Sequence, residues 1–446
     1  MRGPDPTPKG SRVKPERLSR ADAARWHMGT PTNPMVIGAL LLFDRQLTLE
    51  ALETLVRDKL VPHRRFRQHV VESPHRFGAP RWLDDAPFDL RQHVRRLEPS
   101  GPVDAATLIG LVSERINAPL PLDRSPWTFE VVDLLPGGSA LLVRIHHCIA
   151  DGRSLVALLQ QLADEDFDDA LDDRSAERPR ATKERLPGRA SSRPTRARRF
   201  FGRLAGLFRL VPLSRDPVSL LRRPLDGRKC VAWSEAIPLE AIKAIAATHG
   251  HHVADVLLTG VAGALDRYAR EHGQVPRSVH ALLPVAAPSQ GSADELGNHY
   301  ASVFVSLPAA VDDPHARLAM IARDMAVLRS GGQSGIAGGL MRVAGSVAPG
   351  IERRALRWGS RRASLVVSSL AGPKMALHLA GQPLGAVVIW APAAATIGLS
   401  VTLFGYAGAI RLGVLTDSAV IDRPDQLVAA FQAAIDELRA ATPAEK

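Results

Sequence analysis

The chain has 446 residues and a formal net charge of +11; 45% of its residues are hydrophobic and 23% are charged. This length and apolar content suffice for two domains with buried cores, and they exclude a disordered chain. The two cysteines, Cys148 and Cys230, exclude a disulfide framework and suit a reducing compartment.

Residues 1–16 are rich in Pro, Gly, Lys and Arg and contain no apolar core. This composition predicts a disordered tail and excludes a standard secretory signal peptide. We therefore expect a cytoplasmic protein. Its N-terminal domain is expected to span residues 17–175.

A strand, a polar loop and a helix are predicted between residues 140 and 159. The apolar, branched residues at 140–145 are typical of a buried strand, and residues 154–159 have the composition of a helix. The loop between them, residues 146–152, reads HHCIADG. Because the unperturbed pKa of histidine is about 6.5, a histidine at the end of a strand suits a general base near neutral pH.

Structural roles are the alternative for the same residues. Asp151 would cap the following helix by accepting hydrogen bonds from its first N–H groups, and Gly152 would allow a tight turn. His146 and His147 would be buried side chains with satisfied hydrogen bonds. Cys148 raises a third role, that of an acyl-accepting nucleophile beside a histidine. On extended backbone, however, neighbouring side chains point to opposite faces, so we expect Cys148 and His147 not to meet.

The excess positive charge lies in one segment. Residues 178–229 hold 16 Lys or Arg and three acidic residues, a net charge of +13, so the rest of the chain sums to about −2. The first part of this segment, residues 178–195, is rich in Pro, Arg and Ser and predicts a disordered or exposed linker. Residues 198–211 then place apolar side chains at helical spacing with arginines between them.

A basic amphipathic helix of this kind fits an anionic membrane surface. The alternative is an apolar stripe that packs on the body of the protein while the arginines stay in solvent. No aromatic platform or DNA-binding motif accompanies the basic residues, so no nucleic acid is expected as a partner. With its flanks, the segment forms a linker at 176–228 between two domains.

The C-terminal domain, residues 229–446, is expected to contain both strands and helices. A strand is predicted at 231–233, followed by helices at 239–249 and 253–270. No charged residue occurs from 382 to 410, which is longer than the roughly 20 residues of a membrane-spanning helix. Pro and Gly interrupt this segment and its side chains partly alternate, so it predicts two buried strands, at 386–391 and 399–406.

Residues 146–152 resemble the HHxxxDG motif of the bacterial wax ester synthase/diacylglycerol acyltransferase family. A motif this short also occurs in relatives such as condensation domains, but further stretches resemble the family on both sides of it. These are residues 31–35, 88–94, 121–127, 295–298, 366–373 and 406–408. The likeness therefore runs from about residue 17 to residue 438.

The resemblance implies an α/β fold of two domains similar to those of CoA-dependent acyltransferases. Each domain would be a mixed sheet with helices, and an active-site tunnel would pass between the two. The family transfers a fatty acyl group from acyl-CoA to diacylglycerol or a long-chain alcohol, forming triacylglycerol or wax ester. By position, His147 would be the general base, while His146, Asp151 and Gly152 would shape its loop.

The chemistry of acyl transfer agrees with this expectation. A thioester is already activated, so the reaction needs a base for the attacking hydroxyl and a donor for the developing oxyanion. No metal is expected, and no cofactor other than acyl-CoA as the substrate. Because the acceptors are lipids, we expect the protein on the inner membrane face or on lipid droplets, held there by residues 198–211.

Two positions depart from the family pattern. Ala254 and Ser369 stand where the family usually has Asn, and each change removes an amide able to donate a hydrogen bond. Two alternatives therefore stay open. One is a weak or inactive lipid-binding or droplet protein of the same fold, and the other is a condensation-type acyltransferase with a different acceptor.

Four further residues are candidates for substrate binding: Asn298, Ser302, Asp255 and Trp127. Asn298 and Ser302 would donate hydrogen bonds from the C-terminal half. Their structural alternatives are specific. Asn298 would be a turn residue after a glycine, and Trp127 would be a core anchor rather than part of an acyl tunnel.

Overall fold

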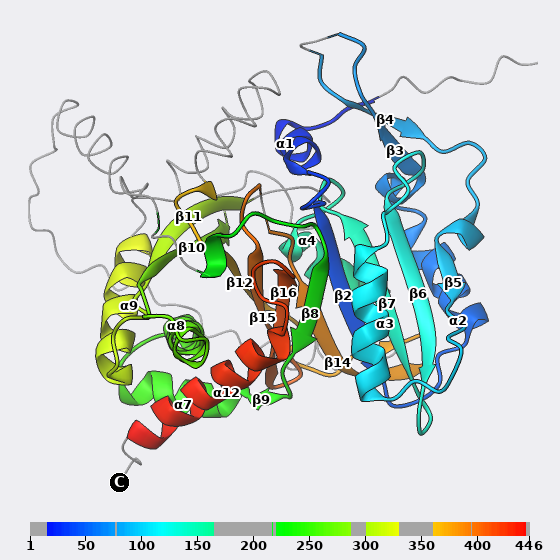
Figure 1. The fold of residues 1–446 in the computed structure, drawn as a ribbon. Coiled ribbons are helices and arrows are strands. Elements are labelled where there is room, and N and C mark those ends of the chain that lie inside the picture. Colours follow the sequence, from blue (N-terminus) through cyan, green and yellow to red (C-terminus); the bar gives the residue numbers. More distant parts are fainter. Residues whose placement is uncertain are drawn as a thin grey trace, which may run out of the picture.

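The computed structural model describes residues 16–75, 78–164, 216, 220–286, 300–329, 360–393 and 395–442. Within these ranges two large sheets lie side by side, and helices cover them (Figure 1). This arrangement confirms the predicted α/β fold of two domains, each a mixed sheet with helices. Residues 1–15 of the tail expected at 1–16, the basic segment at 198–211 and Asn298 lie outside the described residues. Glu16, the last residue of the expected tail, is instead part of a short strand, β1 (Glu16–Arg17).

The first sheet carries the HHCIADG segment. Its strands, in spatial order, are β13 (His378–Leu379), β14 (Gln382–Trp390), β2 (Val36–Phe43), β7 (Gly138–His146), β6 (Trp127–Leu134) and β5 (Val94–Arg96). The strand predicted at 140–145 is thus β7, at the centre of the sheet. A small three-stranded sheet lies beside the first sheet and consists of β1 (Glu16–Arg17), β4 (Arg81–Asp84) and β3 (Gln68–Val71).

Helices cover both faces of the first sheet because its central strands are apolar on both faces. Leu40 of β2 and Ala140 of β7 pack in one cluster with α3 (Ala105–Asn117). Leu41 and Leu141 face the other way and pack in a second cluster with α2 (Leu49–Leu55) and α4 (Gly152–Leu162). This alternation is the two-residue period of a strand. The remaining helical elements of this domain are α1 (Arg20–Met28), η1 (Val56–Leu60), η2 (Arg64–Arg67) and η3 (Leu90–Gln92).

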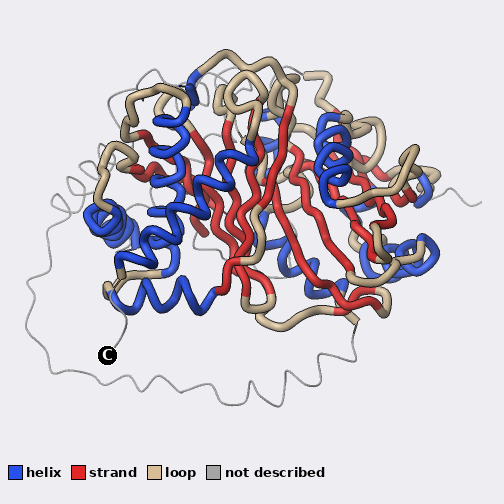
Figure 2. Tube along the Cα trace, turned by 60° about the horizontal axis from the view of Figure 1, so that its bottom comes forward, coloured by secondary structure: helices blue, strands red, loops and turns tan. Residues whose placement is uncertain are grey.

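The second sheet comes entirely from the C-terminal half. Its strands are, in order, β11 (Tyr300–Leu307), β10 (Val279–Ala286), β12 (Leu365–Ala371), β15 (Leu399–Tyr406), β16 (Ala409–Asp417) and β8 (Lys229–Trp233), with β9 (Ile237–Pro238) paired to β16. Its outer face is covered by α7 (Leu239–Thr248), α8 (Val253–Glu271), α9 (Pro314–Arg329) and α12 (Pro424–Ala441), which Figure 2 shows gathered on one side of the strands. A short turn, η5 (Leu220–Arg222), precedes β8.

The helices and strands predicted for the C-terminal half are confirmed. The strand at 231–233 lies in β8, and the helices at 239–249 and 253–270 are α7 and α8. The uncharged segment forms β14 and β15, as its Pro and Gly interruptions indicated. Among the described residues, no helix combines the length and the apolar character needed to cross a membrane.

The two halves of the chain share the first sheet. β13 and β14 belong to the C-terminal half by sequence, yet β14 pairs with β2, with Trp390 opposite Gly38. The inner face of the second sheet also packs against the first domain, because Leu370 and Phe404 join the α4 cluster while Val231 and Leu415 join the α3 cluster. The predicted domain boundary at the linker therefore does not coincide with the boundary between the two sheets, since β13 and β14 follow the linker but belong to the first sheet.

Candidate active site

The HHCIADG segment forms the turn between β7 and α4. β7 pairs with β2 up to His146, which lies opposite Val36, and α4 begins at Gly152. Asp151 is the N-cap residue of α4: its Oδ1 accepts hydrogen bonds from Ser154 N at 2.9 Å and from Ser154 Oγ at 3.0 Å. The capping role considered for Asp151 is therefore present, and it fixes the loop as the family resemblance requires.

His147 is held through its backbone. Its N–H donates to the Met35 carbonyl at 2.7 Å, and the residue is 6% exposed. Met35 directly precedes β2, so this bond continues the β2–β7 pairing one step beyond the last strand residue. The base candidate thus belongs to the rigid end of the sheet rather than to a loose loop.

His146 is buried and neutral. Burial, assisted by the neighbouring His147, lowers the pKa of His146 to about 3. Its Nδ1 accepts the Cys148 N–H at 3.2 Å, and its ring lies 5.1 Å from that of Trp26. These contacts give His146 a structural role in the turn and leave His147 as the histidine of the pair suited to proton transfer.

The expectation that Cys148 and His147 lie on extended backbone is wrong, because residues 147–149 form a turn. A different feature argues against a nucleophilic thiol. Cys148 is 1% exposed, and its burial raises the pKa of the thiol well above the usual value. A protonated thiol is a poor nucleophile, so the structure favours a packing role for Cys148.

An apolar cavity opens beside the motif; it encloses about 780 Å³ of non-atom space, part of which is open to solvent. It lies between α4 and the first sheet. Its residues are Ile37, Ala39, Leu41, Leu52, Leu55, Phe129, Leu141, Val143, Ile145, Gly152, Leu155, Val156, Leu158, Leu159, Leu162, Leu370, Leu379, Val387, Ile389 and Phe404. Every lining residue is apolar, so the cavity suits a hydrocarbon chain.

Gly152 is the point where the motif meets the second sheet. A Cβ atom added at Gly152 would lie 3.0 Å from Leu370 Cδ1, which is tighter than ordinary contact. Leu370 and Phe404 of the second sheet also line the cavity. The cavity therefore reaches from α4 to the junction of the two domains, where the tunnel is predicted.

Two sequence models of known families match the chain. One describes the wax ester synthase/diacylglycerol acyltransferase catalytic domain and matches residues 18–257, and the other describes the C-terminal domain of the same proteins and matches residues 296–439. The chain belongs to the wax ester synthase/diacylglycerol acyltransferase family. The resemblance stated from the sequence is thereby confirmed.

Relatives and solved structures agree with this assignment. A Mycobacterium tuberculosis protein named "Probable diacyglycerol O-acyltransferase tgs1" is 25% identical over 436 residues, covering 92% of this chain and 93% of its own. The solved wax ester synthase/diacylglycerol acyltransferase of Marinobacter aquaeolei has a TM-score of 0.69 at 19% identity, covering 96% and 99% of the two chains. A starter condensation domain of rhizomide synthetase, solved with C8-CoA, has a TM-score of 0.59 at 14% identity and covers 96% and 95%.

The other predicted site residues of this acyltransferase that the structure describes, Trp127, Ser302 and Asp255, do not line the cavity. Trp127 is fully buried in β6: its Nε1 donates to the Phe66 carbonyl at 3.0 Å, and its ring stacks on His93 at 4.4 Å between centroids. This is the core-anchor arrangement considered for it. Ser302 is half-buried on β11, opposite Pro284.

Asp255 is committed to contacts within the C-terminal domain. Its two carboxylate oxygens accept hydrogen bonds from Arg329 at 2.8 and 3.0 Å, and Oδ2 also accepts the His252 N–H at 3.1 Å. It is completely buried at the start of α8. The acid thus caps α8 and holds Arg329 of α9, and it does not line the apolar cavity.

Several residues at the site have no feature in the sequence that predicts a place there. The Met35 carbonyl, Leu370 and Phe404 contribute a backbone group and two apolar side chains, which look like ordinary core in a sequence. Met35 and Leu370 lie in stretches that resemble the family, and Phe404 lies in a predicted strand, but neither signal indicates a place at the site. Their roles depend on how the two domains meet.

The buried, neutral His146 predicts a pH-dependent stability. In the unfolded chain its pKa is about 6.5, so between pH 6.5 and 3 the unfolded state binds more protons and folding weakens as the pH falls. Protonation of His146 in the unfolded chain should lower the free energy of unfolding by about 2 kcal/mol between pH 7 and pH 5. Urea unfolding at both pH values should show that loss in the natural protein and a smaller one in His146→Gln. Equal losses would show that His146 is not held neutral.

Proposed function

We propose that the protein transfers a fatty acyl group from acyl-CoA to diacylglycerol or a long-chain alcohol, with His147 as the general base. Membership of the wax ester synthase/diacylglycerol acyltransferase family supports this reaction class. The observation that carries the proposal is the apolar cavity lined by Gly152, the last residue of the HHCIADG segment that contains His147. A chain in this cavity would bring its carboxyl end toward the histidine.

The proposed reaction is a single transfer without an acyl-enzyme. His147 takes the proton of the acceptor hydroxyl while that oxygen bonds to the thioester carbonyl carbon. The carbon–sulfur bond then breaks, and the CoA sulfur takes up the proton from His147. A neutral His147 is required at the start, and the neutral His146 beside it adds no positive charge that would oppose proton uptake.

Acyl-CoA as the donor has independent support from the fold. The condensation domain of rhizomide synthetase that shares this fold was solved with C8-CoA, so the architecture accommodates an acyl thioester of CoA. In this chain the cavity is lined by apolar residues of β2, β7 and α4, which would contact the hydrocarbon part of such a donor.

The base assignment predicts the effect of removing the imidazole. Thiol release from palmitoyl-CoA, with hexadecanol or diacylglycerol as the acceptor, should fall by about 10²–10⁴-fold in His147→Ala. Cys148→Ala is the matched control and should keep its activity because the buried thiol takes no part. Release that survives His147→Ala would contradict the mechanism. No release by the natural protein with either acceptor would favour a lipid-binding protein without activity.

The cavity assignment predicts a change in acyl-chain preference. Ala39 lines the cavity, so Ala39→Leu should shorten the preferred acyl chain by filling it, with the largest loss for C16 and C18 donors. Leu42 lies on the other face of the same strand and packs toward α3. Leu42→Phe should therefore leave the preference unchanged. Competition among acyl-CoA donors of C8 to C18 measures both variants, and an unchanged preference in Ala39→Leu would refute the assignment.

We also propose that the basic segment at 198–211 brings the enzyme to an anionic membrane or droplet surface. Its charge and apolar spacing in the sequence support this, and the lipid acceptors need such a surface. Deleting residues 198–211 should abolish co-sedimentation with vesicles containing anionic lipid. Activity on a detergent-dispersed acceptor should be retained. Unchanged vesicle binding would end this proposal.

A further inference from the structure

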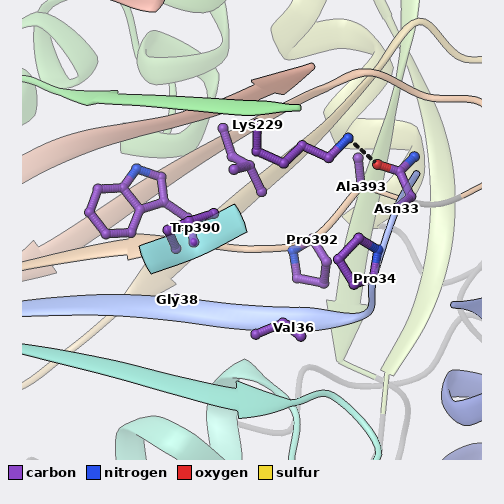
Figure 3. Close-up of a pocket in the computed structure, with 10 residues that line it drawn as sticks. Asn33, Pro34, Val36, Gly38, Lys229, Trp390, Pro392 and Ala393 are labelled. Atoms are coloured by element: carbon purple, nitrogen blue, oxygen red, sulfur yellow. Dashed lines mark hydrogen bonds between the residues drawn. The ribbon is translucent and has the colours of Figure 1, made fainter. Parts of the chain in front are cut away.

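A second, smaller pocket lies on the opposite face of β2 from the apolar cavity (Figure 3). Val36 and Gly38 of β2 face it, whereas Ile37 and Ala39 face the apolar cavity. The far wall comes from the C-terminal half and includes Trp390 and Leu415. One end of this pocket is polar, and it is formed by two buried residues from different domains, Lys229 and Asn33.

Lys229 bridges the two domains. Its Nζ donates to Asn33 Oδ1 at 2.7 Å and to Asp417 Oδ2 at 3.0 Å. Lys229, Asn33 and Asp417 are 6%, 2% and 0% exposed, respectively. Burial lowers the pKa of Lys229, while its hydrogen bond and charge pairing with Asp417 oppose that shift. Asp417 also accepts the N–H groups of Asp226 and Gly227 at 3.1 and 3.0 Å, so its position is fixed.

Asn33 uses its whole side chain for contacts with the C-terminal half. Its Oδ1 accepts from Lys229, and its Nδ2 donates to the carbonyls of Ala395 and Ile397, both at 2.9 Å. Figure 3 shows the Lys229 chain extending from β8 to Asn33, which stands just before β2. Three hydrogen bonds from one buried amide tie the start of β2 to the second domain.

The path from Asn33 to the base is short. Only Pro34 separates Asn33 from Met35, and the Met35 carbonyl accepts the His147 N–H at 2.7 Å. The ring of Pro34 fixes its backbone φ angle, so the position of Asn33 strongly limits the position of the Met35 carbonyl. On the other side of the same turn, Leu370 of the second sheet lies so near Gly152 that an added Cβ atom would be 3.0 Å from its Cδ1. The His147 turn is therefore held between two contacts with the second domain.

We propose that Asn33 and Lys229 are positioning residues, which fix the His147 turn relative to the second sheet. The inference rests on the proposed role of His147 as the base. Proton transfer and attack require reacting atoms about 3 Å apart, and a misplacement of about 1 Å can reduce the rate on the order of 100-fold. The Asn33–Lys229–Asp417 network sets this spacing through the Met35 carbonyl, which accepts the His147 N–H.

Asn33→Ala tests the proposal directly, because Lys229 keeps its partner Asp417 and no buried charge is left alone. We expect kcat for thiol release to fall at least tenfold, with less than a twofold change in KM for palmitoyl-CoA. The fraction of acyl groups transferred to water instead of hexadecanol should rise. Asn33→Asp, which keeps an acceptor for Lys229 but loses both donated bonds, provides a second variant if Asn33→Ala fails to fold.

A matched control separates positioning from loss of stability. Arg317 is 2% exposed on α9, where it donates to the Val311 carbonyl at 2.6 Å and pairs with Asp266, remote from the turn. Arg317→Met should lower the melting temperature while leaving kcat unchanged. A folded Asn33 variant with the natural kcat would overturn the proposal. So would a loss of kcat in Arg317→Met that matches the loss in Asn33→Ala at an equal shift in melting temperature.

A double substitution distinguishes this inference from the base assignment itself. If Asn33 acts through His147, then adding Asn33→Ala to His147→Ala should change the residual rate by less than twofold. A further tenfold loss in the double variant would show that Asn33 acts by another route. Full activity of His147→Ala alone would instead refute the proposed function, whatever the Asn33 variants do.

Discussion

The antiparallel pairing of β2 with β7 is the constraint on which the site depends. Its register places Val36 opposite His146 and so aligns the Met35 carbonyl with the His147 N–H. It also decides which β2 side chains face the apolar cavity. A slip of one residue would turn Ile37 and Ala39 to the opposite face and lose both features. Apolar clusters on both faces of the pair hold the register in place.

Burial gives different roles to chemically similar groups within one turn. The same exclusion of water that keeps His146 neutral also keeps the Cys148 thiol protonated. The Asp151 carboxylate is also buried, and it accepts hydrogen bonds from Ser154 in the first turn of α4. His146, Cys148 and Asp151 thus have structural roles in the segment. His147 is left as its candidate for proton transfer. Other polar candidates, such as Asp255, are occupied in the same way elsewhere.

The sequence predicted what depends on local pattern. The strand at 140–145, the helix after Gly152 and the strands within the uncharged segment follow from periodicity and from Pro and Gly positions, and each is confirmed. Contacts across domains have no such pattern. The pairing of β14 with β2 and the approach of Leu370 to Gly152 bring together residues far apart in the chain. Trp127 shows the converse, because a conspicuous aromatic residue near the motif packs in the core.

The pairing of β14, from the C-terminal half, with β2 has a consequence for folding during synthesis. Until the ribosome has passed Trp390, β2 has an open edge, and the sheet that carries the motif lacks one of its central neighbours. Nascent chains that expose an unpaired apolar edge for so long are prone to associate with one another. The N-terminal half on its own would therefore expose the unpaired edge of β2 that β14 covers in the full chain.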